Sequence, residues 1–257
     1  MKRCYLISSL IVFCLLGLSA GSSLATTGKF PFESGEELVL QLNYMGEPGG
    51  VFTITVDSGQ LNNRPVYKLN VDVQTAGMLN SFYKIRDHAT SYLDRKNLYS
   101  LGYNFYEVRA DESDTEKVRY DHDKQIAVAE GRRNLKIRKF TQDGISAIYK
   151  LRTETFTVGD SVTIPVNVTG DNYLAQFLVK DKEVVRIEGA KLPAYRLLIR
   201  PKDPKNYQEM LSKLDGQASG VSLWLSSNYR HVPLKLKAPL KLGTLVARFK
   251  SYKAGGL

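Results

Sequence analysis

The sequence predicts an all-β protein built on one strongly curved, mainly antiparallel sheet, either an open barrel or a sandwich, with two or three short helices covering its concave side. Three observations predict this fold. Apolar and polar residues alternate along most of the chain, turn-forming residues separate the alternating runs, and no strand–helix–strand rhythm or fixed repeat occurs. A period of two is typical of half-buried strands, and short connections are typical of antiparallel neighbours.

The first 25 residues have the pattern of a signal peptide. Lys2 and Arg3 precede an apolar run that is too short to span a bilayer, and small residues end the segment at Ala25. We expect cleavage after Ala25, export to the periplasm and no integral membrane insertion afterwards. Residues 26–257 then form a single β-rich domain, which we expect to be a monomer.

Cysteine and charge limit the chemistry of the mature chain. Cys4 and Cys14 are the only cysteines, and both lie in the leader, which excludes disulfides and thiolate chemistry. The formal charge of +10 falls to +8 without Lys2 and Arg3. In an exported protein such a charge favours an anionic envelope lipid or glycan over nucleic acid, although a basic surface that serves solubility alone remains an alternative.

The alternating runs begin with a hairpin. Residues 37–44 alternate leucine with polar residues, the Gly- and Pro-containing segment 45–50 is expected to form a turn, and a second strand follows at 51–56. Further strands are expected at 66–73, 84–93, 99–108, 117–121, 126–130, 134–140, 161–168, 173–179, 183–189, 194–201, 219–226, 232–239 and 242–252. The acidic segment 111–116 is expected to be a solvated loop.

One segment among the strands has helical spacing. In residues 142–152, Ile145, Ile148 and Tyr149 fall at positions i, i+3 and i+4, and Asp143 can act as the N-cap. Such a short helix is marginal in isolation, so its apolar face is expected to pack on the sheet.

Two further segments are helix candidates. Residues 203–216 begin with an Asp-Pro pair, carry an apolar stripe that includes Met210 and Leu214, and end at a glycine, as a helical insertion would. Residues 76–83 can form a single helical turn. Together with the first segment, these helices are expected to cover the concave face of the sheet.

Three segments resemble one known family. Residues 30–56, 144–152 and 223–249 resemble, in order, the opening, middle and closing motifs of domain-of-unknown-function family 3108. The matching residues are Pro31, Phe32, Gly35, Glu36, Gly46, Ser146, Ala147, Tyr149, Arg152, Trp224, Arg230 and Pro233. The chain departs from the family pattern at Ile145 and Ile148, where the family has leucine, and in an insertion at 201–220. The resemblance implies a secreted, mainly β envelope protein and no particular activity.

Motifs for catalysis, metals and cofactors are missing. His88, His122 and His231 lie far apart without metal-ligand spacing, and no nucleophile elbow, phosphate loop or dinucleotide motif occurs. We expect no metal and no cofactor, and a binding protein rather than an enzyme. A glycosidase carboxylate pair among the acidic residues remains an alternative.

Basic side chains suggest where an anion could bind. Arg132, Lys136 and Arg138 alternate with apolar residues and would form an outward stripe, and Lys235 and Lys237 repeat this pattern. Protection of a strand edge is the alternative interpretation.

Arg152 ends the apolar helical face of residues 142–152. If it is buried, it needs an anionic partner, either Glu36 in a structural role or a lipid phosphate in a functional one. General experience with buried arginines favours the structural role.

These patterns favour a non-catalytic envelope protein that binds or carries an amphipathic anionic lipid-like molecule, similar at the level of fold to lipoprotein carriers of the LolA type. Two alternatives stay open: a glycan-binding module or glycan-acting enzyme, and a structural partner in an envelope assembly. The candidate ligand-binding residues are Arg132, Lys136, Arg138, Arg152, Ile145, Ile148, Tyr149, Met210 and Leu214.

Overall fold

The computed structural model describes residues 30–82, 84–109, 112–131, 134–168, 171–202, 220–240 and 243–256. The elements in chain order are β1 (Glu37–Tyr44), β2 (Glu47–Leu61), β3 (Arg64–Thr75), α2 (Gly77–Phe82), β4 (Arg86–Asp94), β5 (Ser100–Arg109), β6 (Glu112–Asp121), β7 (Ile126–Ala129), β8 (Leu135–Lys136), α3 (Gly144–Leu151), β9 (Ser161–Val168), β10 (Asp171–Ile187), β11 (Ala190–Pro201), β12 (Val221–Ser226), β13 (Pro233–Pro239) and β14 (Thr244–Lys253). The expected leader and the expected helix at 203–216 lie outside the described residues.

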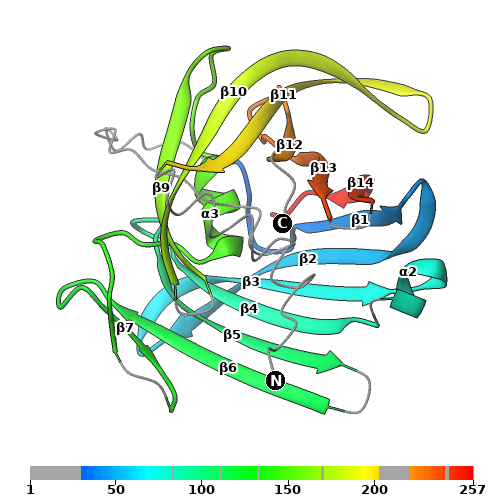
Figure 1. Cartoon of the computed structure of the whole chain (residues 1–257). Helices are drawn as coiled ribbons and strands as arrows, with labels where there is room; N and C mark the ends of the chain where they lie inside the picture. The colour runs from blue at the N-terminus through cyan, green and yellow to red at the C-terminus, as the bar shows by residue number, and fades with distance from the viewer. Residues whose placement is uncertain are drawn as a thin grey trace.

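The strands form one antiparallel sheet of 14 strands in the order β8-β7-β6-β5-β4-β3-β2-β1-β14-β13-β12-β11-β10-β9. From β1 in the middle of the sheet, the described chain runs outward to β8, crosses through α3 to the opposite edge at β9, and returns to the middle. The first and last strands pair with each other there. Figure 1 shows the sheet curving strongly, with α3 beside β9. The prediction of a curved, mainly antiparallel all-β fold is confirmed in the form of one large open sheet.

The two edges of the sheet approach each other without forming a ladder between the described strands. Gln142, just before α3, makes a single parallel bridge to Val166 of β9. Tyr120 of β6 donates its hydroxyl to the Asn167 carbonyl, with 3.2 Å between the oxygens. Asn172 of β10 donates to the Lys136 carbonyl of β8 at 2.6 Å. The sheet is therefore nearly closed by side-chain bonds.

The connection between β1 and β2 is tighter than the sequence predicted. The turn consists of Met45 and Gly46, both with positive φ (52° and 96°), as a two-residue hairpin requires. The residues from Glu47 onward, which were expected to be part of the turn, already pair with β1 across a bulge. Gly50 cannot be replaced by a larger residue, because its φ is 147° and a Cβ atom would lie 2.2 Å from the Gln74 carbonyl oxygen.

Three further sequence expectations are wrong. Residues 173–179 and 183–189 belong mostly to the single long strand β10, which a register shift at Val179 and Asp181 bends instead of a turn. Only Leu135–Lys136 of the strand expected at 134–140 pairs with a neighbour. Most of the acidic segment expected as a loop belongs to β6, because Glu112 to Glu116 pair with β5.

Along the strands, apolar side chains on the inner face of the sheet alternate with more exposed side chains on the outer face. In β1, Leu38, Leu40 and Leu42 are buried in the main core, whereas Val39 and Gln41 between them are partly exposed. The main core joins side chains from most strands, though none from β6, β7 or β8, and from both described helices, including Leu79 of α2. Smaller clusters lie elsewhere on the sheet, around Val118 and around Trp224.

The two described helices occur where helical spacing was expected. Residues of α2 pack against β2, where a Cβ atom on Gly49 would come within 2.9 Å of the Leu79 side chain. The capping box of α3 is formed by Asp143 and Ser146. Among the described residues, neither helix has the length and apolar character needed to cross a lipid bilayer.

Candidate ligand-binding site

The helix α3 is the element on which the candidate site is built. Its buried residues are Gly144, Ile145, Ser146, Ala147, Ile148, Tyr149 and Leu151. Contacts to β4 and β9 hold it against the sheet. Because Gly144 has no side chain and those of Ser146 and Ala147 are small, the helix backbone can approach its neighbours closely. Both ends of the helix are fixed by polar contacts.

Asp143 anchors the N-terminal end of α3 to the sheet. One carboxylate oxygen, Oδ1, accepts the backbone N–H groups of Ile145 (2.9 Å) and Ser146 (3.0 Å). The other, Oδ2, accepts the hydroxyl groups of Ser91 on β4 and Ser100 on β5, each at 2.6 Å. A single buried carboxylate therefore caps the helix and ties it to two strands.

Gln142 extends this anchor to the opposite edge of the sheet. Its N–H donates to the Pro165 carbonyl (2.7 Å), and its carbonyl accepts the N–H of Asn167 (2.9 Å). Its side-chain amide accepts the N–H of Ser100 (3.0 Å) and donates to the Leu98 carbonyl (2.8 Å). The start of α3 therefore bridges strand β9 to the first half of the sheet.

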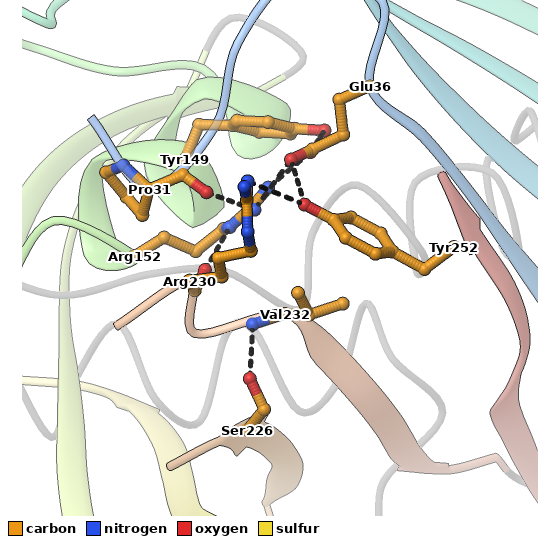
Figure 2. Close-up of polar contacts among 8 residues, drawn as sticks. All are labelled: Pro31, Glu36, Tyr149, Arg152, Ser226, Arg230, Val232 and Tyr252. Carbon is orange, nitrogen blue, oxygen red and sulfur yellow. Dashed lines mark hydrogen bonds and ion pairs between the residues drawn. The ribbon is translucent and has the colours of Figure 1, made fainter. Parts of the chain in front are cut away.

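Arg152 anchors the C-terminal end of α3 through a buried ion pair, shown in Figure 2. Nη1 lies 2.6 Å from Oε1 of Glu36, and Nη2 lies 2.9 Å from Oε2. Nη2 also donates to the Pro31 carbonyl (3.1 Å), and Nε donates to the Arg230 carbonyl (3.0 Å). Both charged side chains are almost fully buried, at 1% and 0% exposure. The guanidinium group is therefore bound within the protein, in the structural arrangement that the sequence favoured.

Two tyrosines complete the shell around Glu36. Tyr149 donates its hydroxyl to Oε1 (3.1 Å) and Tyr252 donates to Oε2 (2.8 Å). Burial, and then the charge of Glu36, raise the pKa of Tyr149 well above its ordinary value and raise that of Tyr252 in the same direction. Burial alone would lower the pKa of Arg152, but its bonds to Glu36 raise it overall. The Glu36 carboxylate thus accepts hydrogen bonds from four donor groups, two on Arg152 and one on each tyrosine.

An apolar cavity lies between α3 and the inner face of the sheet. Its lining residues are Leu40, Phe52, Ile54, Val71, Ile145, Ile148, Leu223, Pro233, Lys235, Leu236, Leu245 and Ala247. All of them except Lys235 are apolar. The space open to the centres of water-sized molecules is about 40 Å³, and the whole empty region, including its solvent-facing side, is about 630 Å³. A lining of this kind suits a hydrocarbon group and offers little to a sugar or an ion.

The structure separates the residues that the sequence grouped as a ligand site. Ile145 and Ile148 line the apolar cavity. Tyr149 and Arg152 bind Glu36 instead. Lys136 and Arg138 are exposed near β8 and are absent from the cavity lining. Arg132, Met210 and Leu214 lie outside the described residues.

Sequence reasoning missed the sheet side of the cavity. Leu40, Phe52 and Val71 come from three strands, and only the register of the sheet brings them opposite Ile145 and Ile148. Their inward position could be read from alternation within each strand. The closure of the sheet around α3 had no local signal in the sequence.

The histidines have structural partners. His122 Nε2 lies 2.6 Å from the Ser100 carbonyl oxygen, and His231 Nδ1 lies 3.0 Å from the Arg152 carbonyl oxygen. Burial lowers the pKa of both rings. His88 contacts Asp72 at 2.9 Å. Across the part of the chain that the structure describes, no group of three or more His, Cys, Asp or Glu side chains could hold a metal ion.

A single antiparallel sheet that curves almost into a barrel around an apolar interior defines the class of β-barrel-like proteins. Residues 40–250 match the family described as "Protein of unknown function (DUF3108)", so the chain belongs to that family. A β-barrel-like protein of the domain of unknown function DUF1849 from Brucella abortus has a similar solved structure, with a TM-score of 0.56 at 8% sequence identity over 86% of this chain and 98% of that chain. At this identity the likeness shows the fold alone. A search of curated sequences found no match.

Proposed function

We propose that the protein binds the acyl chain of an amphipathic, anionic, lipid-like molecule in the apolar cavity between α3 and the sheet. The observation that carries this proposal is the lining: two isoleucines of α3 oppose apolar side chains from six strands, and Lys235 is its sole polar member. Burial of hydrocarbon against such a lining contributes about 25 cal/mol per Å².

In this proposal α3 covers the inner face of the curved sheet. Because Asp143 and Arg152 fix both of its ends, the helix keeps its place while side chains along the cavity move. Movement is required, since the present space of about 40 Å³ accommodates only a few water molecules. Rotamer changes of Ile148 and the facing strand residues would widen it.

The anionic character of the ligand rests on charge. The formal net charge of +10, which becomes +8 without Lys2 and Arg3, favours an anion, and the expected signal peptide would place the protein where envelope lipids occur. Lys136 and Arg138 lie away from the cavity lining, so the headgroup role that their pattern suggested remains a separate prediction. Charge reversal at both positions tests it, with weaker binding at low salt as the expected result.

A titration with a fluorescent fatty acid tests the proposal. Ile148→Phe adds volume inside the cavity and should weaken binding, because the acyl chain and the new ring compete for the same space. Ile137→Phe is the matched control: Ile137 is similarly buried, at 5% against 7%, but belongs to the separate cluster around Val118. Melting temperatures of both variants show whether each one remains folded.

The expected result is saturable binding that Ile148→Phe weakens and Ile137→Phe leaves unchanged. Equal binding by all three folded proteins would contradict the proposed site. If fatty acid does not bind but oligosaccharides do, the glycan-binding alternative replaces this proposal.

A further inference from the structure

A second candidate site lies on the outer face of the sheet, away from the main core. Cross-strand pairing aligns residues of five neighbouring strands there: Gln41 of β1 opposes Arg248 of β14, Arg248 opposes Lys235 of β13, Lys235 opposes Trp224 of β12, and Trp224 opposes Arg196 of β11. Neighbouring strands lie about 4.8 Å apart, so adjacent members of this row are in contact range.

Like charges are adjacent in this row. Arg248 and Lys235 lie directly opposite each other, an arrangement that ordinarily destabilises a sheet. Arg196 is neutralised by an ion pair with Asp181. Within the described ranges, neither Arg248 nor Lys235 has an acidic side chain within ion-pair distance. Burial, and then the charge of Arg248, lower the pKa of Lys235. Glu183 opposes this effect in part, because its charge raises the pKa of Lys235, but it forms no ion pair with either cation.

Trp224 holds Lys235 in place. The lysine Nζ lies 4.2 Å from the centroid of the indole ring, a cation–π contact. The indole N–H donates in turn to the carboxylate of Glu183 on β10. Trp224 also packs with Val185, Ala194 and Leu234 in a small apolar cluster. Figure 1 shows the long β10–β11 hairpin curving beyond the strands β12, β13 and β14. The contacts of Trp224 hold this hairpin beside the charged row.

The hairpin and the sheet enclose a groove of about 290 Å³, counted as space open to the centres of water-sized molecules. Its lining residues are Gln41, Asn43, Val185, Arg186, Ile187, Glu188, Leu234, Lys235, Arg248, Phe249 and Lys250. Four of these are cations, from β10, β13 and β14, and one is an acid. Of the four, Arg186, Arg248 and Lys250 are exposed, so their charged ends are available to a ligand.

We infer that this outer groove binds a phosphate-bearing ligand. Arg248 can bind phosphate oxygens through two parallel N–H groups, and Lys235 supplies an adjacent point charge that Trp224 orients. A bound phosphate would also relieve the repulsion between the two cations. The outer groove and the acyl-chain cavity have one lining residue in common, Lys235, whereas Arg248, Lys250 and Arg186 do not line that cavity.

The position of Trp224 provides a reporter, because it is the only tryptophan in the chain. Inorganic pyrophosphate is the probe, titrated into the full-length protein at low salt while indole fluorescence and heat of binding are both recorded. The test variant is Arg248→Gln/Lys250→Gln, which leaves Trp224 and Lys235 in place. The matched control is Lys96→Gln/Lys117→Gln, which removes the same charge from exposed positions outside the groove.

We expect saturable binding that perturbs Trp224, weakens as salt rises, and falls about tenfold or more in the test variant but remains in the control. Absence of heat and of a fluorescence change in the wild-type protein would overturn the inference. An equal loss in the test and control variants would also overturn it, because net charge alone would then explain the binding.

Vesicles distinguish the source of the phosphate. Co-sedimentation with vesicles that contain phosphatidylglycerol, abolished by pyrophosphate and by Arg248→Gln/Lys250→Gln, identifies a lipid headgroup. Binding of pyrophosphate without vesicle binding identifies a soluble phosphorylated ligand. Ile148→Phe should affect neither result, so this site can fail or succeed separately from the acyl-chain cavity.

Discussion

The Arg152 guanidinium and the Glu36 carboxylate form a nearly solvent-free ion pair, in which each side-chain nitrogen and oxygen atom makes at least one hydrogen bond inside the protein. Taking two such charges out of water is costly, and their attraction offsets the cost only when the geometry is good and further hydrogen bonds are made. Tyr149, Tyr252 and two backbone carbonyls supply those bonds. The pair joins the N-terminal segment, α3 and the turn after β12, three regions far apart in sequence.

Replacing Glu36 with Gln should destabilise the protein by about 3–5 kcal/mol, because Arg152 would remain buried without a counter-charge. Urea denaturation measures this loss. The double variant Glu36→Gln/Arg152→Met should lose less than the sum of the two single variants, since it leaves no unpaired buried charge. Additive losses would show that the two side chains do not act as a pair.

His122 should make stability depend on pH. Its Nε2 donates to the Ser100 carbonyl, and its buried Nδ1 has no hydrogen-bond partner among the residues that the structure describes. Burial is the largest effect and lowers its pKa. The bond to the Ser100 carbonyl opposes burial, Arg64 lowers the pKa further, and the neighbouring acids Asp121 and Asp123 raise it, but the pKa is lowered overall. The unfolded chain therefore takes up a proton near pH 6.5, above the pH at which the folded protein does. The free energy of unfolding should fall as the pH drops below about 6.5.

The variant His122→Gln tests this prediction, because glutamine can donate to the same carbonyl and does not titrate. Denaturation between about pH 7.5 and about pH 5.5 should show a smaller loss of stability than in the wild-type protein. Part of the loss should remain, since burial also lowers the pKa of His231. A variant with the full wild-type pH dependence would contradict the role of His122.

At the scale of elements, α3 could be predicted because its signals are local. The spacing of Ile145 and Ile148 and the cap at Asp143 all lie within a few residues of one another. The bonds from Asp143 to Ser91 and Ser100 could not be predicted, because they span more than forty residues and depend on how the sheet closes. The same limit applies to the sheet side of the apolar cavity.

The strands show the same division between local and distant information. Alternation identified β1 and β9 with the observed bounds. The same pattern predicted two strands in place of β10, because the charged residues Lys180 and Asp181 in its middle resemble a turn when the pairing with β11 is unknown. It extended β8 beyond Lys136, since alternation persists in the sequence where no neighbouring strand is present to pair with it.

Asp143→Ala should destabilise α3 and its attachment together. Loss of an N-cap costs about 1 kcal/mol, and here two buried serine hydroxyls also lose their acceptor, so a larger loss is expected. Hydrogen exchange should show faster opening of the amides of Ile145 and Ser146. Asp160→Ala, at an exposed position, is the control. A loss no larger than that of the control would mean that Asp143 does not hold the helix.

At the scale of the whole molecule, one topological feature creates the interior. The first and last described strands, β1 and β14, pair in the middle of the sheet, and both halves curve away toward edges that meet beside α3. The crossing segment must therefore pass where the sheet would otherwise be open. Its first residues bridge the edges, and its isoleucines face the interior that the sheet surrounds.

The acyl-chain proposal follows from this arrangement, and native mass spectrometry tests it most directly. Protein released without detergent from the cells that make it should carry an added mass equal to that of a lipid-like molecule. Ile148→Phe should carry less of it and Ile137→Phe as much as the wild type. Detection of the wild-type protein only without added mass, or with the added mass of an oligosaccharide, would contradict the proposal.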